Sequence, residues 1–312
     1  MRAKKIIFMG TPDFAVASLE KLIEYNIEVA AVVTAPDRPA GRGQKLQQSA
    51  VKKYAVSKGI IVLQPEKLKA DDFIKNLKSI NADLFVVVAF RMLPDVVWQM
   101  PPLGTINLHG SLLPKYRGAA PINWAVINGD TETGVTTFFI EKQIDTGQII
   151  DSASIKIKTV DTAGSIHDKL MVIGAKLLAE TVGKIFNGTT RPKPQPDELA
   201  THAPKIFKPD CKIDWTGETI SIFNKIRGLS PYPTAYTTIK SNDIAKTIKL
   251  FKVDYTLDTQ NCTGKLKVND DLLYIGTNNG WIIIHELQLE GKKRMNCQDF
   301  LKGFDILEWH PE

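Results

Sequence analysis

Two polar side chains stand two positions apart at the end of an apolar run, in the segment TINLHG at residues 105–110. Alternate side chains of a β-strand share a face, so we expect Asn107 and His109 on one face and Ile106 and Leu108 on the other. An amide and an imidazole on one face can both donate hydrogen bonds to an oxygen on which negative charge develops. The alternative is structural: a hydrogen-bonded histidine that caps a loop and an asparagine in a turn would give the same sequence. Taken singly, each residue favours this structural interpretation.

The residues that follow this strand support the other interpretation, a ligand-binding site. Open α/β sheets bind ligands at the C-terminal ends of their strands, and the run SLLP at residues 111–114 could line an apolar, partly hydrogen-bonding slot there. Asp145, in the turn IDTG between two predicted strands, would add a carboxylate. An aspartate in an Asp-Thr-Gly turn is more often a turn former.

Strands and helices alternate in the first half of the chain and must position these residues. Apolar runs predict strands at residues 4–10, 28–34, 60–63, 84–90 and 105–109, and periodicity predicts helices at 13–25, 49–58 and 71–78. A pair of strands at 134–139 and 148–157 and a helix over 163–186 follow. This order predicts an α/β fold with an open, mostly parallel Rossmann-like sheet.

The composition changes after residue 190. Pro192, Pro194 and Pro196 stiffen the chain and predict a linker over residues 191–206, between a larger domain at 1–190 and a smaller one at 207–312. The smaller domain combines one amphipathic helix at 217–228 with several short β-like runs. This texture predicts an OB-like β-barrel.

Several classes of protein are excluded by composition and spacing. The three cysteines lie far apart and form no CxxC pair or Cys/His cluster, which argues against a zinc site or a disulfide framework. The apolar stretch at 6–9 is too short for a signal sequence and no run could span a membrane, so we expect a cytoplasmic protein. A single glycine, Gly10, follows the first strand and no Walker A motif occurs, which argues against a dinucleotide or P-loop site.

Positive charge is concentrated in one segment. The chain has a net charge of +6, yet residues 206–312 are neutral overall, and residues 38–58 contain no acidic side chain. The basic residues of that segment are Arg38, Arg42, Lys45, Lys52, Lys53 and Lys58. Such a segment suits a polyanionic partner, and a solvated basic loop explains the charge equally well.

Motifs spread over residues 5–303 resemble those of the methionyl-tRNA formyltransferase family, in the same order. They are MGTPDFAVASL, TAPDRPAGRGQKL, VVVAFRMLP, INLHGSLLPKYRGAAPINWAV, IDTGQI, KIDW, IRGLSPYPTAYT and GKKRMNCQDFLKG. The Asn, His, SLLP and Asp motifs are shared by the wider family of folate-dependent formyltransferases and indicate the reaction type. The PDRPAGRG loop and the C-terminal motifs indicate the transfer-RNA member.

The resemblance implies formyl transfer from 10-formyltetrahydrofolate, without a metal, to the α-amino group of methionyl initiator tRNA, for translation initiation. Asn107 and His109 would donate to the oxygen that becomes negative. Asp145 would keep His109 charged and would accept or relay the proton of the attacking amine, and the sequence leaves open which role dominates. By resemblance, the folate lies against Phe90, Arg91, Leu93, Ser111, Leu112, Leu113 and Pro114.

A nucleic-acid partner is also implied by the resemblance. The Pro- and Gly-rich loop at 36–45 would enter the acceptor stem with Arg38, Arg42 and Lys45, and initiator tRNA would be chosen because its weak first base pair costs less to deform. The OB-like domain would contact the tRNA, although its zero net charge weakens a purely electrostatic version. Nothing in the sequence indicates more than a monomer.

The chain departs from the family pattern at two places. Ala17 stands where proline is common, and Tyr232, Pro233 and Thr234 replace a commoner Trp-Pro-Gly. Neither change touches the three polar residues. The tRNA-type loop argues against members that act on glycinamide ribonucleotide or a nucleotide sugar, and a folate-dependent hydrolase domain is a more distant alternative. A non-catalytic tRNA-binding protein is the alternative of another class, and the joint presence of the three polar residues argues against it.

Overall fold

The computed structural model describes residues 3–40 and 45–312. The described chain packs into two compact units, each built from more than one stretch of sequence. The first unit comprises residues up to 118, 134–155 and 167–202, and the second comprises 119–133, 156–166 and 203–312. No helix in the described ranges has both the length and the apolar character that crossing a membrane requires.

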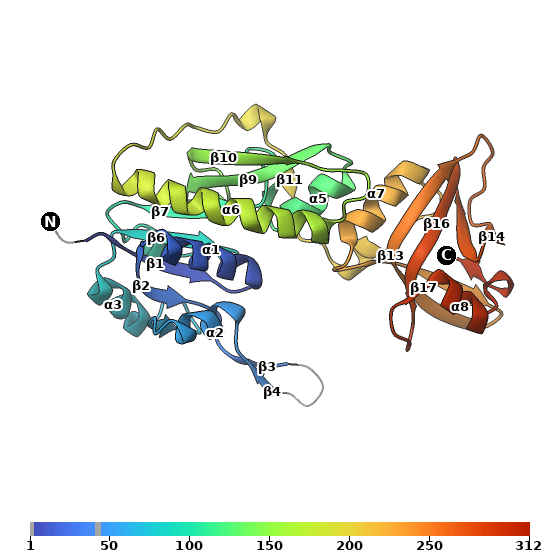
Figure 1. The fold of residues 1–312 in the computed structure, drawn as a ribbon, viewed down its shortest axis with the longest axis horizontal. Coiled ribbons are helices and arrows are strands. Elements are labelled where there is room, and N and C mark those ends of the chain that lie inside the picture. The colour runs from blue at the N-terminus through green and yellow to red at the C-terminus, as the bar shows by residue number, and fades with distance from the viewer. Residues whose placement is uncertain (1–2, 41–44) are drawn as a thin grey trace. The chain divides into compact units, whose positions relative to one another are not determined.

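A seven-stranded sheet of order β10-β9-β7-β6-β1-β2-β5 forms the centre of the first unit (Figure 1). Its strands are β1 (Lys5–Gly10), β2 (Glu28–Val33), β5 (Val62–Leu63), β6 (Leu84–Val88), β7 (Thr105–His109), β9 (Glu132–Phe139) and β10 (Ile149–Lys156). The neighbours from β5 to β7 pair in parallel, and β9 pairs with β7 antiparallel. The predicted open, mostly parallel sheet is therefore confirmed.

Helices cover both faces of this sheet. They are α1 (Asp13–Glu24), α2 (Ala50–Ser57), α3 (Asp71–Ile80), α4 (Asp95–Trp98) and α6 (Ala163–Phe186). Helix α6 packs closely on β7 and β9 because Gly174 has no side chain: a Cβ there would lie 3.1 Å from Leu108 and 3.3 Å from Val135. On the opposite face, Val87 joins an apolar cluster with residues of α3 and α4, among them Phe73 and Val97.

Local sequence explains where these helices begin and end. The Ser49 hydroxyl accepts the backbone N–H of Lys52 at 3.0 Å and caps α2. Helix α3 begins with Asp71 and Asp72, whose negative charges suit a helix N-terminus, and it ends at Asn81 in the left-handed conformation.

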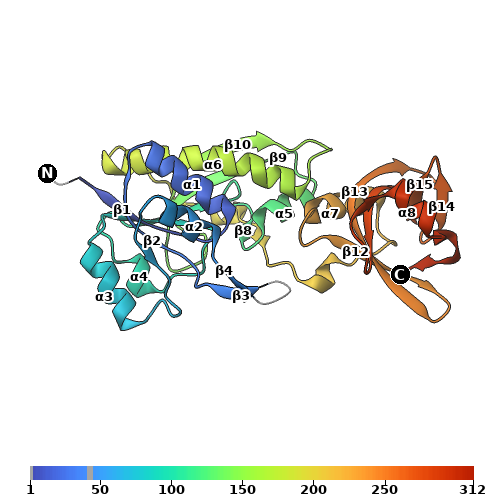
Figure 2. The same cartoon turned by 60° about the horizontal axis from the view of Figure 1, so that its bottom comes forward.

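The part of the basic segment that precedes α2 forms a two-stranded antiparallel ribbon from β3 (Arg38–Ala40) and β4 (Lys45–Gln47), where the sequence predicted only a loop. The ribbon follows β2 and extends beyond α2 (Figure 2). Asp37 fixes its base, because its carboxylate accepts hydrogen bonds from Lys52 Nζ at 2.6 Å and from Gln64 Nε2 at 2.8 Å.

Residues 191–202, in the predicted linker, are hydrogen-bonded to the first unit. The backbone of Lys193 pairs with Ile149 of β10, and a short 3-10 helix, η1 (Asp197–Leu199), precedes β11 (His202–Ala203). Thr201 accepts two N–H groups at 2.9 Å, with its carbonyl from Arg117 of β8 (Arg117–Gly118) and with its hydroxyl from Tyr116. This part of the segment is therefore held in place along its length.

The second unit is built on a curled antiparallel sheet of order β14-β15-β16-β13-β12-β18, with β17 paired to β16 (Figure 1). Its strands are β12 (Ala235–Ser241), β13 (Ile244–Leu257), β14 (Leu266–Asn269), β15 (Leu272–Thr277), β16 (Gly280–Leu289), β17 (Met295–Asn296) and β18 (His310–Pro311). Its helices are α5 (Pro121–Ile127), η2 (Lys208–Cys211), α7 (Thr219–Leu229), α8 (Cys297–Gly303) and η3 (Ile306–Glu308). A smaller domain of barrel type after a Rossmann-like sheet confirms the predicted fold class.

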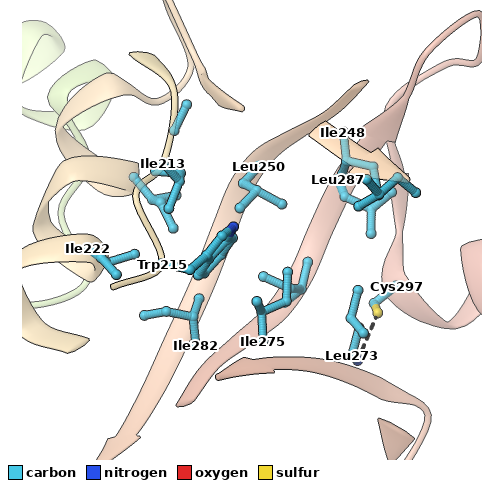
Figure 3. Close-up of a cluster of buried hydrophobic side chains, with 14 of the residues drawn as sticks. Ile213, Trp215, Ile222, Ile248, Leu250, Leu273, Ile275, Ile282, Leu287 and Cys297 are labelled. Atoms are coloured by element: carbon cyan, nitrogen blue, oxygen red, sulfur yellow. Dashed lines mark hydrogen bonds between the residues drawn. The ribbon is translucent and has the colours of Figure 1, made fainter. Parts of the chain in front are cut away.

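Trp215 lies in the apolar core of the second unit, beside isoleucine and leucine side chains of the curled sheet (Figure 3). Its indole N–H donates to Thr237 Oγ1 at 2.9 Å, so the one polar atom of the ring is satisfied. Helix α5 packs closely on α7, because a Cβ on Gly228 would lie 2.5 Å from Ile127 Cγ1.

Candidate active site

The predicted polar pair lies at the C-terminal end of β7, inside the sheet. Asn107 is in register with Val87 of β6 and with Phe138 of β9. In-register neighbours point to the same face, so Asn107 projects on the side of α3 and α4, opposite to Leu108 under α6. His109 shares the face of Asn107, as the alternation predicts.

The His109 ring is buried, and both of its nitrogens face protein acceptors. Its side chain is only 6% exposed, and Nδ1 lies 3.7 Å from Oδ2 of Asp145. Nε2 lies 2.9 Å from the carbonyl oxygen of Tyr116, and because a carbonyl only accepts, Nε2 carries the proton of this hydrogen bond. The ring of Phe138 meets the imidazole edge-on, at 6.4 Å between centroids and 87° between planes.

Asp145 reaches His109 from the turn between β9 and β10. Its backbone is left-handed, with φ of 56°, which aspartate adopts more readily than most residues. Oδ2 also accepts the backbone N–H of Gly118 at 2.9 Å. The next glycine of the turn has no room for a side chain, because a Cβ on Gly147 would lie 1.7 Å from the Phe139 carbonyl oxygen. The turn is therefore tightly built where it presents the carboxylate.

Asn107 is half-buried at this strand end. Within residues 3–40 and 45–312, no protein group forms a hydrogen bond with its side chain. An amide with free donors beside an imidazole–carboxylate pair can bind an oxygen of another molecule.

The loop after β6 contains three of the residues expected against the folate. The side chains of Phe90 and Leu93 pack with the α3–α4 cluster, and Arg91 donates to the backbone carbonyls of Pro65 and Glu66. In the described part of the chain, the backbone N–H and C=O groups of residues 90–93 have no protein partner. This loop therefore offers unpaired donors and acceptors at the edge of the sheet.

The SLLP loop after β7 is fixed from within. Ser111 is fully buried and its hydroxyl donates to the Lys115 carbonyl at 2.6 Å. Thr136 of β9 donates to the Ser111 carbonyl and accepts the N–H of Leu113, which is also buried. The remaining expected residues, Leu112 and Pro114, are half-buried.

Two of the three basic residues expected at the nucleic acid, Arg38 and Lys45, belong to the two strands of the ribbon. Arg38 is exposed on β3, the backbone of Lys45 lies in β4 with its side chain outside the described atoms, and Arg42 lies outside the described residues. The hydrogen bond from Lys52, followed by that from Gln64, lowers the pKa of Asp37 at the base of the ribbon.

Three groups that the sequence did not indicate contact the site. They are the carbonyl of Tyr116 on His109, the N–H of Gly118 on Asp145 and the side-chain amide of Gln195, which donates to the carbonyls of Asp145 and Gly147. The first two are backbone groups and leave no signal in residue type. Gln195 lies in a segment whose composition indicated only a linker.

A parallel sheet with an imidazole, a carboxylate and an amide at one strand end, followed by a barrel-type domain, matches a known pair of domains. The formyl transferase family model matches residues 4–182, and the model of the formyl transferase C-terminal domain matches residues 205–305. Among solved structures, the sugar 3N-formyl transferase WlaRD, in the presence of dTDP and 5-N-formyl-THF, has a TM-score of 0.67 at 20% identity, covering 94% of this chain and all of that one. The HypX protein of Aquifex aeolicus, in complex with tetrahydrofolic acid, has a TM-score of 0.64 at 18% identity, over 97% of this chain and 48% of that one.

Two curated relatives are more similar in sequence than these structures and indicate which formyltransferases the chain belongs with. A methionyl-tRNA formyltransferase of Bacteroides thetaiotaomicron is 48% identical over 97% of this chain and 96% of its own length. One of Parabacteroides distasonis is 51% identical over 96% and 95%, respectively. The chain therefore belongs to the methionyl-tRNA formyltransferase family.

Proposed function

We propose that the chain transfers the formyl group of 10-formyltetrahydrofolate to the α-amino group of methionyl initiator tRNA and so supplies N-formylmethionyl-tRNA for translation initiation. Family membership supports the reaction, and one observation supports the site: His109 and Asp145 meet at the end of β7, beside the free amide of Asn107. We also propose that it acts in the cytoplasm as a monomer; the three cysteines are free, in keeping with a reducing compartment.

In the proposed reaction the amine nitrogen bonds to the formyl carbon, and the bond from that carbon to the folate nitrogen breaks. The formyl oxygen becomes negative in between. The amine loses one proton and the leaving folate nitrogen gains one, directly or by relay through the site. The Asn107 amide donates to this oxygen, and so does His109 through Nδ1–H, which is not committed to Asp145 at 3.7 Å. Each donor contributes about 3–4 kcal/mol to the stability of the transition state.

Asp145 has two roles in this proposal. At 3.7 Å the Asp145 carboxylate forms an ion pair rather than a hydrogen bond with a charged His109, so Nδ1–H stays available to the formyl oxygen. The carboxylate therefore favours the charged ring, and it accepts or relays the proton of the amine.

The loops after β6 and β7 fit a flat, polar heterocycle such as the pterin of a folate. The unpaired backbone groups of residues 90–93 match a ring edge that carries donors and acceptors, and Leu112 and Pro114 add apolar surface. Ser111 and Leu113 act in this proposal by fixing the loop, because both are buried.

The ribbon is the part of the first unit best suited to the tRNA. Arg38 is exposed on it, the backbone of Lys45 lies in its second strand, and Arg42 lies between them in sequence. Arginine and lysine side chains bind phosphates, and Arg42 is the residue we place near the weak first base pair.

The test is incubation with 10-formyltetrahydrofolate and two methionine-charged tRNAs, initiator and elongator, with N-formylmethionine as the readout. We expect rapid formylation of the initiator only, and a reduction of about 100-fold or more in the formylation rate for His109→Ala, with little change in tRNA affinity. His167→Ala is the matched control, because His167 also faces an aspartate, Asp168 at 3.0 Å, but is exposed. No formylation by the wild type would refute the function, and an unaffected His109→Ala would refute the site.

A further inference from the structure

Three consecutive residues are linked to the imidazole–carboxylate pair. Tyr116 and Gly118 contact it directly, and Arg117 reaches it through Gln195. The carbonyl of Tyr116 accepts from His109, and the N–H of Gly118 donates to the carboxylate of Asp145. The side chain of Arg117 lies between these two contacts in sequence and is mostly buried, with 10% exposed. Its guanidinium does not contact Asp145 but donates twice to Gln195 Oε1, at 3.0 Å and 2.9 Å, and once to the exposed carboxylate of Asp197, at 2.8 Å.

Gln195 is hydrogen-bonded to the backbone of the turn that contains Asp145. Its amide nitrogen donates to the carbonyl of Asp145 at 2.9 Å and to that of Gly147 at 2.8 Å. The orientation of the amide is unambiguous, because one end faces two acceptors and the other faces two guanidinium donors. All four hydrogen bonds of the Gln195 side chain are thus used: two come from Arg117, and two go to the carbonyls of Asp145 and Gly147 in the turn.

We propose that Gln195 and Arg117 are positioning residues for Asp145. Gln195 holds the turn by its two carbonyls, so the carboxylate stays between the Gly118 N–H and His109 Nδ1. Arg117 orients Gln195 and prevents its amide from rotating. This inference rests on the proposed function, since its effect is expressed through the reaction that Asp145 serves.

A neutral amide is the side chain that this position requires. A glutamate at 195 would keep an oxygen for Arg117 but would place a second oxygen against the carbonyls of Asp145 and Gly147, where a donor is needed. A misplacement of about 1 Å at a reacting group costs about 100-fold in rate, so a loosened turn is expected to reduce kcat rather than substrate binding.

The test compares Gln195→Ala and Gln195→Glu with the wild type in steady-state formylation of initiator tRNA. Both variants should lower kcat by about 10- to 100-fold and leave KM for tRNA and folate within about twofold. Arg117→Lys keeps the charge but loses the two-pronged contact, and should lower kcat by a smaller factor. Gln148→Glu is the matched control, because Gln148 is an exposed glutamine of the same hairpin and should stay within about twofold of wild type.

A double-mutant cycle separates positioning from a general loss of stability. If Gln195 acts through the carboxylate, Gln195→Ala should change kcat by less than about twofold in an Asp145→Asn background. Equal losses in both backgrounds, or a Gln195→Glu variant with wild-type kcat, would overturn the proposal. Gln195→Glu has the size of the native residue and provides the test even where Gln195→Ala fails to fold. A wild-type chain without formylation activity would instead refute the proposed function.

Discussion

Replacing Asp145 by asparagine should separate the charge of this residue from its shape. The asparagine oxygen can still accept the Gly118 N–H, which in the wild type lies 2.9 Å from Oδ2. The same atom lies 3.7 Å from His109 Nδ1, so the replacement leaves a neutral oxygen where the wild type has a carboxylate oxygen. The substitution therefore removes the negative charge and keeps the hydrogen bond to Gly118.

The size of the effect follows from the separation and burial of the pair. Unit charges 3.7 Å apart attract each other by about 4 kcal/mol at an effective dielectric constant of about 20, and the side chains are only 6% and 13% exposed. If the whole attraction stabilises the transition state, its loss corresponds to about 1000-fold in rate. We expect Asp145→Asn to lower the rate by about 100- to 1000-fold, since water and neighbouring dipoles compensate in part.

Single-turnover formylation of initiator tRNA with saturating folate measures this rate without a contribution from product release. Asp151→Asn is the matched control, because Asp151 forms a carboxylate–ammonium pair with Lys184 at 3.0 Å on β10, outside the site. We expect that control to stay within about twofold of the wild type. Thermal unfolding of all three proteins shows whether the fold is retained.

A rate for Asp145→Asn within about threefold of the wild type would refute the electrostatic reasoning. It would show that the carboxylate contributes only through the hydrogen bond that asparagine preserves. A lower rate accompanied by an equally lowered rate for Asp151→Asn would also contradict the prediction, because the effect would then not depend on the distance to His109.

Three further predictions concern the ribbon and the second unit. Arg42→Ala should raise KM for initiator tRNA by about tenfold and leave KM for folate unchanged, and a defect confined to folate would contradict the tRNA assignment. Because Lys52 lowers the pKa of Asp37 in the fold, their contact contributes fully above the unfolded-state value of 3.8 and is lost as pH falls through the lower folded-state value. The protection factors of the ribbon amides, which correct for the slower intrinsic exchange in acid, should therefore fall at low pH, and already at pH 7 in Asp37→Asn; equal protection at pH 7 in both proteins would contradict this. Gly228→Ala should lower the free energy of unfolding by about 1–3 kcal/mol because its Cβ would meet Ile127, and an unchanged denaturation midpoint would refute the packing argument.

Helices with strong periodicity and buried strands could be predicted closely from the sequence. The helix expected over 163–186 is α6 with the same bounds, and the strand expected over 105–109 is β7 with the same bounds. The short strands of the ribbon could not be predicted, because Arg38 and Lys45 belong to a Pro- and Gly-rich segment without alternation. Their pairing depends on the base fixed at Asp37, which is a contact to distant residues.

The sequence by itself determined that Asn107 and His109 share one face at a strand end, because alternation along a strand is a local property of the backbone. It also determined the fold class, through the order of its apolar runs. Only the tertiary structure decided that Asp145 lies 3.7 Å from His109, that backbone groups at 116 and 118 hold the pair, and that Gln195 of the proline-rich segment grips the turn. These contacts join residues up to 50 positions apart and mostly involve backbone atoms, which are the same in every residue and so leave no mark on the order of the side chains.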